Sequence, residues 1–149
     1  MVKMKIIDAS GLILGRMATK VAKLALNGEE IILVNCENAI ISGKPSWVLA
    51  HWREKEHRTQ PFKGPFIPKM ADRMVKSVIR GMLPHGRWSE GSRGRMAHKR
   101  IKCYISVPLE FKDKKFETVD GADSADLKTQ DKITVGELAR LLKAKGHGK

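Results

Sequence analysis

The first forty residues alternate between short apolar runs and a helical pattern of apolar positions. Residues 4–9 contain the pair Ile6-Ile7 and predict a strand, while the unbroken apolar run at 31–34 predicts a strand covered on both faces. Between these runs, residues 15–26 place apolar side chains at helical spacing: Met17, Val21 and Leu24. Strand, helix and buried strand form a βαβ unit with parallel strands. We therefore expect residues 4–41 to form the scaffold of the protein.

Two further helices are expected in the middle of the chain. Residues 46–58 predict a polar helix, and residues 59–68 contain three prolines and predict a loop. Residues 69–83 predict an amphipathic helix, which Pro84 ends. Its apolar side is made of Met70, Met74, Val75, Val78, Ile79 and Met82. Its opposite side carries Lys69, Arg73, Lys76 and Arg80. We expect the apolar side to pack inward and the four cations to face outward.

The C-terminal half is less regular until its last helix. Residues 85–100 mix glycine with arginine, show no helical period and predict a basic arm. Alternation over 102–107 predicts a strand, and residues 109–132 predict an exposed connection with room for a short hairpin. The last helix is expected over 133–146. Its start combines a capping box, Thr134 with Glu137, and a hydrophobic staple, Ile133 with Leu138.

The charge of the chain is concentrated in one segment. A length of 149 residues suits a single domain. Fifteen of the 29 Lys and Arg residues lie in residues 44–102 beside four acids, which gives this basic block +11 of the total +13. Such repulsion favours an anionic partner, and nucleic acid is the first candidate. The side chains expected to bind RNA are Arg16, Lys44, Arg53, Arg58, Lys63, Lys69, Arg73, Lys76, Arg80, His85, Arg87, Arg93, Arg95, His98, Lys99 and Arg100.

Aromatic residues are few, and most of them lie within the basic block. The aromatic residues of the basic block are Trp47, Trp52, Phe62, Phe66 and Trp88. Rings interleaved with cations suit stacking on nucleobases. Burial in the core explains some of them equally well, and the sequence leaves both alternatives open.

Motifs for other chemistry do not fit. Gly11 and Gly15 are separated by three residues and followed by Arg16, so the loop matches neither a P-loop nor a dinucleotide fingerprint. His51, Glu54 and His57 lack the spacing of a zinc protease site. We therefore expect no metal, no cofactor and no small-molecule substrate.

The cysteines and the N-terminus bear on location. Cys36 and Cys103 lie far apart in apolar runs, as is typical of buried, inert thiols in a reducing compartment. The N-terminal apolar run is too short for a signal peptide, and no stretch is long enough for a membrane span. We expect a cytoplasmic protein that is not associated with membranes.

Three functions remain to be weighed. A structural RNA-binding protein explains the basic block best, since no catalytic motif is visible. An RNA-cleaving or RNA-modifying enzyme would use His85 or His98 as a general base. A third alternative is a regulatory RNA-binding protein.

Several motifs in register resemble the universal large ribosomal subunit protein thirteen family. They are Asp8-Ala-Ser-Gly-Leu-Ile-Leu-Gly-Arg-Met-Ala18, Val34-Asn-Cys-Glu-Asn38 leading to Ser42-Gly-Lys44, and Val78-Ile-Arg-Gly-Met-Leu-Pro84. The short connection after the first helix and the C-terminal helix resemble the archaeal and eukaryotic branch.

The resemblance implies a three-layer α/β/α domain around a four-stranded, mainly parallel sheet. It also implies a structural protein, not an enzyme, that binds large-subunit ribosomal RNA, contacts neighbouring large-subunit ribosomal proteins and supports subunit assembly in the cytoplasm.

Overall fold

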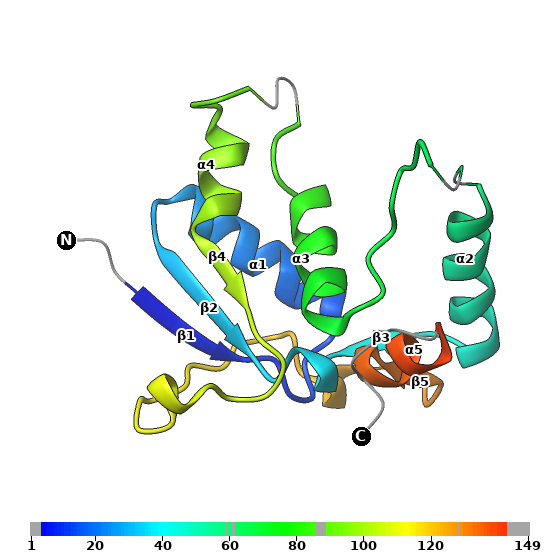
Figure 1. The fold of residues 1–149 in the computed structure, drawn as a ribbon. Coiled ribbons are helices and arrows are strands. Elements are labelled where there is room, and N and C mark those ends of the chain that lie inside the picture. The colour runs from blue at the N-terminus through cyan, green and yellow to red at the C-terminus, as the bar shows by residue number, and fades with distance from the viewer. Residues whose placement is uncertain (1–3, 59, 61, 86–88, 128, 143–149) are drawn as a thin grey trace.

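Helices and short strands alternate along the chain. The computed structural model describes residues 4–58, 60, 62–85, 89–127 and 129–142 (Figure 1). The helices of this part are α1 (Leu14–Leu26), α2 (Pro45–His57), α3 (Ala71–Gly81), α4 (Arg93–Lys99) and α5 (Val135–Leu141). The strands are β1 (Met4–Asp8), β2 (Glu30–Val34), β3 (Ile40–Ser42), β4 (Ile101–Cys103) and β5 (Lys132–Thr134). The fold is therefore of the α/β class, as expected.

Three parallel strands form the main sheet, in the order β1-β2-β4. Ile7 pairs with Leu33, and Leu33 pairs with Cys103 on its other side. The βαβ unit expected at the N-terminus is present, with α1 between β1 and β2. The strand that the sequence predicted over 102–107 is β4, which begins at Ile101 and ends at Cys103. It ends early because the chain turns away after Cys103 and reaches a positive φ at Ser106.

The expectation of a four-stranded sheet is wrong. Strand β3, which follows β2 in the sequence, is not part of the main sheet. It pairs antiparallel with β5, with Ile41 opposite Ile133. Asn35 causes the departure, since its left-handed backbone (φ 54°) leads into the 3-10 turn η1, Cys36–Asn38. The chain is thereby redirected before β3 begins.

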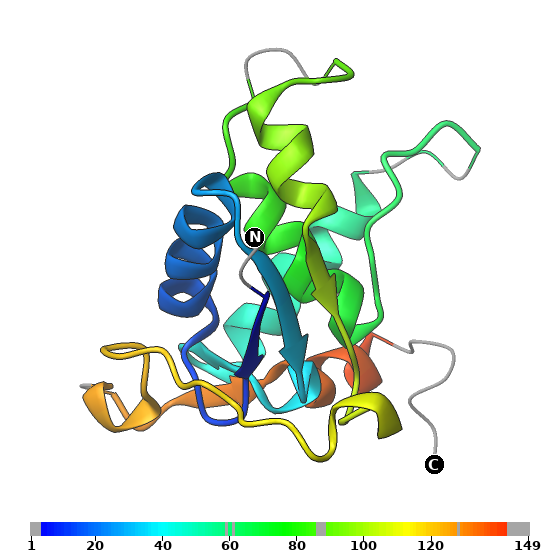
Figure 2. The ribbon, with the colours of Figure 1, turned by 90° about the vertical axis from the view of Figure 1, so that its left-hand side faces the viewer.

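The two faces of the main sheet are covered differently. Ile7, Ile31 and Leu33 share the main core with α1 and α3, because successive strand residues point to opposite faces. The other face carries a small cluster of buried residues, Ile6, Ile32, Val34 and Phe111, against which Tyr104 and Val107 pack. Figure 2 shows α1 in blue beside the strands and α3 in green behind them, with the segment after β4 crossing their lower end. The described residues therefore form two layers, the helices and the main sheet, and the other face of the sheet is covered by the small cluster around Phe111. The expected three-layer α/β/α sandwich is not found in this part of the chain.

The segment expected to be an irregular basic arm contains a helix. α4 buries Gly94 and Ala97, and it packs against α1 and α3. Because its contact face is made of such small residues, the sequence shows no strong apolar period there. The middle helices were predicted within two residues at each end: α2 begins at Pro45 and α3 ends at Gly81.

The last helix begins as its capping signals indicated. The Thr134 hydroxyl accepts a hydrogen bond from the backbone N–H of Glu137 at 3.2 Å, and the staple residues Ile133 and Leu138 are both buried. The predicted end of this helix, at residue 146, lies outside the described residues. The sequence predicted an exposed connection over 109–132 with room for a short hairpin. Between 109 and 127 the chain instead forms two 3-10 turns, η2 (Leu109–Phe111) and η3 (Ser124–Asp126).

Candidate nucleic-acid interface

The amphipathic character of α3 is confirmed. Met74, Val75 and Ile79 are buried in the main core, while Arg73 and Arg80 are exposed. Two details differ from the expectation: Met82 is 40% exposed, and Lys69 and Lys76 are half-buried. Helical periodicity places these two groups on opposite sides, since 3.6 residues complete one turn. The helix is therefore anchored by one side and presents guanidinium groups on the other.

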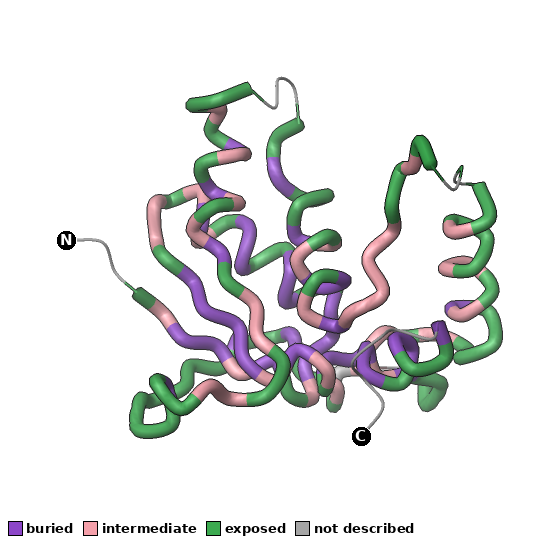
Figure 3. The backbone as a smooth tube through the Cα atoms, viewed as in Figure 1, coloured by how far each residue is buried: buried purple, intermediate pink, exposed green. Residues whose placement is uncertain are grey.

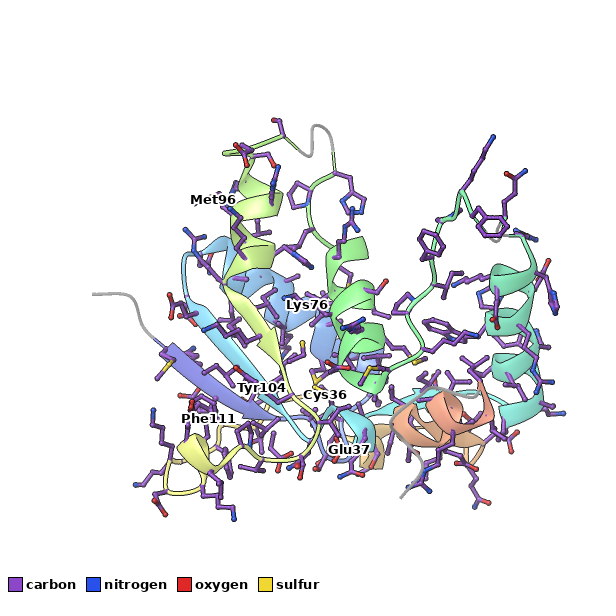
Figure 4. The ribbon with its side chains drawn as sticks, viewed as in Figure 1. Cys36, Glu37, Lys76, Met96, Tyr104 and Phe111 are labelled. Atoms are coloured by element: carbon purple, nitrogen blue, oxygen red, sulfur yellow. The ribbon has the colours of Figure 1, made fainter. Side chains whose placement is uncertain are left out.

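Cations of α3 lie beside α4. The pKa of His98 in α4 is lowered by burial first, and then by the positive charges of Lys76 and Arg80 in α3. Figure 4 labels Lys76 on α3 and Met96 on α4. Exposed Arg93 and Lys99 extend the positive surface along α4. The fold thus gathers cations from two helices that are distant in the sequence.

A basic cavity of about 350 Å³ lies between α3 and β4. Its lining residues are Asp72, Arg73, Lys76, Lys102, Cys103 and Tyr104. Lys102 was not among the residues expected to bind RNA. It follows buried Ile101 in a strand, where successive side chains point to opposite faces, and this alternation is a signal that Lys102 is exposed. Only the pairing of β4 with β2 brings Lys102 next to α3. Three cations and one acid give the cavity a positive balance that suits a phosphate group.

A second set of cations lies on α2 and on the chain that follows it. Lys44, Arg53, Arg58 and Lys63 are all exposed. Figure 3 shows α2 as a largely exposed helix, and Val48 is its only buried residue. Figure 1 places this helix on the side of the molecule away from β1. Most of the expected RNA-binding residues thus fall into two groups. One is an α3–α4 face, made of Arg73, Lys76, Arg80, Arg93 and Lys99, and the other is an α2 arm, defined as residues 44–69.

Some expected RNA-binding residues have partners within the protein. The Arg100 guanidinium donates to the carbonyl oxygen of Ala25 in the last turn of α1 at 3.3 Å, a position where a cation stabilises the helix end. Arg95 forms an ion pair with Glu90 at 3.3 Å. The Arg16 guanidinium donates to the carbonyl oxygen of Gly121 at 3.5 Å. These contacts give the three arginines a structural role besides any contact with RNA.

Ion pairs also occur in the α2 arm. Arg58 pairs with Glu54 within α2, and Lys69, at the end of the arm, pairs with Glu56. His85 is exposed at the end of the described segment after α3, and Arg87 lies outside the described residues.

The two thiols meet in the fold. Cys36 is buried, and its pKa is raised by a hydrogen bond with Cys103, then by burial. Cys103 is half-buried beside the basic cavity, so only one of the two thiols is as enclosed as the sequence indicated. Among the described residues, no three His, Cys, Asp or Glu side chains come together in a way that would hold a metal ion. That same part of the chain contains no helix with the length and apolar character needed to cross a membrane.

Comparison with known proteins decides the family. The model of the family described as ribosomal protein L13 matches residues 2–110, which include β1 to β4 and helices α1 to α4. The chain belongs to the ribosomal protein L13 family.

Archaeal members of the L13 family are similar over nearly the whole chain. The large ribosomal subunit protein uL13 of Methanosarcina barkeri is 45% identical over 143 residues, covering 95% of this chain and 99% of that protein. The uL13 of Archaeoglobus fulgidus is 41% identical over 142 residues, covering 95% and 88%. The uL13 of Methanocaldococcus jannaschii is 40% identical over 146 residues, covering 95% and 99%.

These alignments extend beyond residue 110, where the L13 family model ends. They therefore include most of the part of the chain that forms β5 and α5. The resemblance inferred from the sequence motifs is confirmed, including its archaeal type.

Proposed function

We propose that this chain is a structural constituent of the large ribosomal subunit that binds large-subunit ribosomal RNA. In this role it neutralises RNA phosphates in the cytoplasmic ribosome, contacts neighbouring ribosomal proteins and supports assembly of the subunit. The α3–α4 face provides the main contact, and the α2 arm provides a second one.

The arrangement of α3 is the observation that carries this proposal. A helix whose buried side is Met74, Val75 and Ile79 holds Arg73 and Arg80 outward in fixed positions. α4 and Lys102 add cations at its flank. Rigidly spaced cations recognise folded RNA by its backbone geometry, because phosphate positions follow from the shape of the RNA. Membership in the L13 family supports the ribosome as the source of that RNA.

Sedimentation of a cell lysate tests the assembly. We expect the protein to migrate with large subunits in a one-to-one ratio and to be scarce among free proteins. Migration with neither large subunits nor their precursors would contradict the proposal and favour a regulatory RNA-binding protein. Turnover of labelled RNA by the isolated chain would instead favour the enzyme alternative.

Salt dependence tests the mode of binding. Binding of the purified chain to large-subunit RNA should weaken steeply with salt, by about 0.7 to 0.9 in log K per unit of log salt for each phosphate neutralised. A flat response would show that cation–phosphate contacts do not dominate.

A further inference from the structure

Three aromatic side chains of the α2 arm lie open to solvent. Phe62 is 96% exposed, Phe66 is 77% exposed and Trp47 is 65% exposed. Trp52, by contrast, packs against the main core. Single exposed apolar residues are common on protein surfaces, but three large rings on one short stretch are not. Packing against the core therefore accounts for half-buried Trp52 but not for Trp47, Phe62 or Phe66, and Trp88 lies outside the described residues.

The loop after α2 fixes the position of both phenylalanines. The backbone N–H of Gly64 donates to the carbonyl oxygen of Gln60 at 3.0 Å, which closes a tight turn with Phe62 and Lys63 at its tip. Gly64 has a φ of +72°, and a Cβ atom there would lie 3.3 Å from two ring carbons of Phe66. The Phe66 ring therefore lies against Gly64. A ring that is already held in place, as that of Phe66 is, loses little conformational entropy when a partner binds.

Trp47 is ordered by its neighbour on α2. Its indole stacks on the imidazole of His51, with ring centroids 5.4 Å apart and planes within 3° of parallel. Much of the indole remains exposed in this arrangement. A preformed parallel stack of this kind offers a surface on which a further planar group can stack.

The charges around these rings favour RNA over a protein as the partner. Residues 44–69 contain six Lys and Arg residues but only two acids, Glu54 and Glu56. Both acids are paired with cations of the same arm. A protein-binding surface has an apolar centre depleted in charge, whereas here each phenylalanine is close in sequence to a cation. Aromatic rings interleaved with cations suit single-stranded RNA, whose bases stack while its phosphates are neutralised.

We propose that Phe62 and Phe66 form a stacking platform for unpaired nucleobases, and that Trp47, near the start of α2, offers a separate stacking surface. This inference rests on the proposed function and deepens it. The α3–α4 face binds phosphates of folded RNA, and the α2 arm adds contacts to bases that protrude from loops or bulges.

Two RNA probes and two matched double variants of the full chain test the platform. One probe is a twelve-nucleotide oligoadenylate with a central 2-aminopurine, and the other is a blunt twelve-base-pair RNA duplex. Phe62→Ala with Phe66→Ala should weaken binding of the single strand about fivefold or more and reduce stacking-dependent quenching of the 2-aminopurine, because each ring stacks on one base while Trp47 is retained. Binding of the duplex should stay within about twofold, since its bases are already stacked.

The leucine pair, Phe62→Leu with Phe66→Leu, separates stacking from apolar contact. Leucine retains apolar bulk without an aromatic face, so it should bind the single strand as weakly as the alanine pair. Binding restored by leucine would overturn the platform, because it would show that apolar contact with the RNA, and not stacking, provides the affinity. The exposure of both rings predicts unchanged thermal unfolding in all variants.

The same measurements separate this inference from the proposed function. If the unaltered chain binds both RNAs with steep salt dependence and the alanine pair binds the single strand equally well, only the platform is wrong. If the unaltered chain binds neither these RNAs nor large-subunit RNA, the proposed function is wrong as well.

Discussion

Lys69, two residues before α3, forms an ion pair with Glu56 in α2. The contact joins α2 to the C-terminal end of the α2 arm, directly before α3 begins. Both side chains remain partly exposed, at 41% and 40%. A pair of this kind contributes little to folding because water and salt screen it. Its main effect is to place a carboxylate beside a cation that is expected to contact RNA.

Glu56→Gln should therefore strengthen RNA binding. The substitution removes a negative charge that opposes phosphates and leaves the Lys69 ammonium without its carboxylate partner. We expect affinity for large-subunit RNA to rise about two- to fourfold at low salt, with a change in unfolding free energy below about 1 kcal/mol. Filter binding and thermal unfolding measure the two effects. Weaker binding by the variant would mean that the ion pair orders the arm for RNA.

Reversing two charges on α3 should separate binding from folding. Arg73→Glu with Arg80→Glu acts on exposed side chains opposite the buried side of the helix. We expect cooperative unfolding to persist, RNA affinity to fall at least about tenfold, and the salt slope to become shallower by about 1.4 to 1.8. Loss of folding in this variant would show that these side chains also support the core.

A matched control distinguishes local from overall charge. Lys112→Glu with Lys115→Glu changes the net charge equally, on exposed residues of the connection after β4. Binding by this control should fall much less than binding by the α3 variant. Equal losses would indicate that total charge, and not the α3–α4 face, determines affinity.

Gly136 is expected to be intolerant of any side chain. A Cβ atom at this position in α5 would lie 3.1 Å from both the Cβ and the carbonyl oxygen of Glu37. Glu37 has little freedom to move, because its carboxylate accepts the backbone N–H of Ser106 at 3.1 and 3.2 Å. Gly136→Ala should destabilise the protein by about 1 to 3 kcal/mol in chemical denaturation.

Gly15 provides the matched helical control for that substitution. It lies exposed in α1, and a Cβ atom there would meet nothing within 4 Å. Gly15→Ala should stabilise the protein by up to about 1 kcal/mol, since alanine restricts the unfolded chain. Equal effects of the two substitutions would mean that α5 does not approach Glu37 closely.

The two thiols should differ in reactivity. A hydrogen bond with Cys103 and burial raise the pKa of Cys36, so its thiolate is suppressed in the native protein. Mass spectrometry after alkylation of the folded chain should find Cys103 modified well before Cys36. The unfolded thiol loses its proton near the ordinary pKa of 9.0 while native Cys36 retains it, so raising the pH through this value should lower stability. Rapid alkylation of native Cys36 at pH 8 would contradict this environment.

His98 should titrate below its ordinary pKa of 6.5. Burial, then the charges of Lys76 and Arg80, disfavour the imidazolium. As the pH falls through 6.5, His98 is protonated in the unfolded chain before it is protonated in the native protein, so the free energy of unfolding decreases. This decrease ends once the pH is below the native pKa, because both states then carry the proton. NMR titration of the imidazole measures the value, and Lys76→Met should raise it. An unchanged pKa in that variant would mean that the charge of Lys76 does not contribute to the shift.

Local sequence signals predicted the elements whose apolar pattern matches their burial. The period of α3 indicated both its buried Met74 and its exposed Arg73. Thr134 marked the start of α5, because a cap is formed by residues three positions apart. The helix α4 was missed since it contacts its neighbours through residues as small as Gly94 and Ala97, which leave no apolar stripe.

The sequence by itself determined the βαβ scaffold, the outward cations of α3 and the family, because each depends on residues that are near one another in the chain or on motifs in fixed order. Only the tertiary structure decided that β3 pairs with β5, that Lys102 joins Lys76 in one cavity, and that Trp52 packs inside while Phe62 remains exposed. These outcomes depend on contacts between distant segments. Such contacts form through competition among alternative pairings across the whole chain, and no local period records which of them is the most stable.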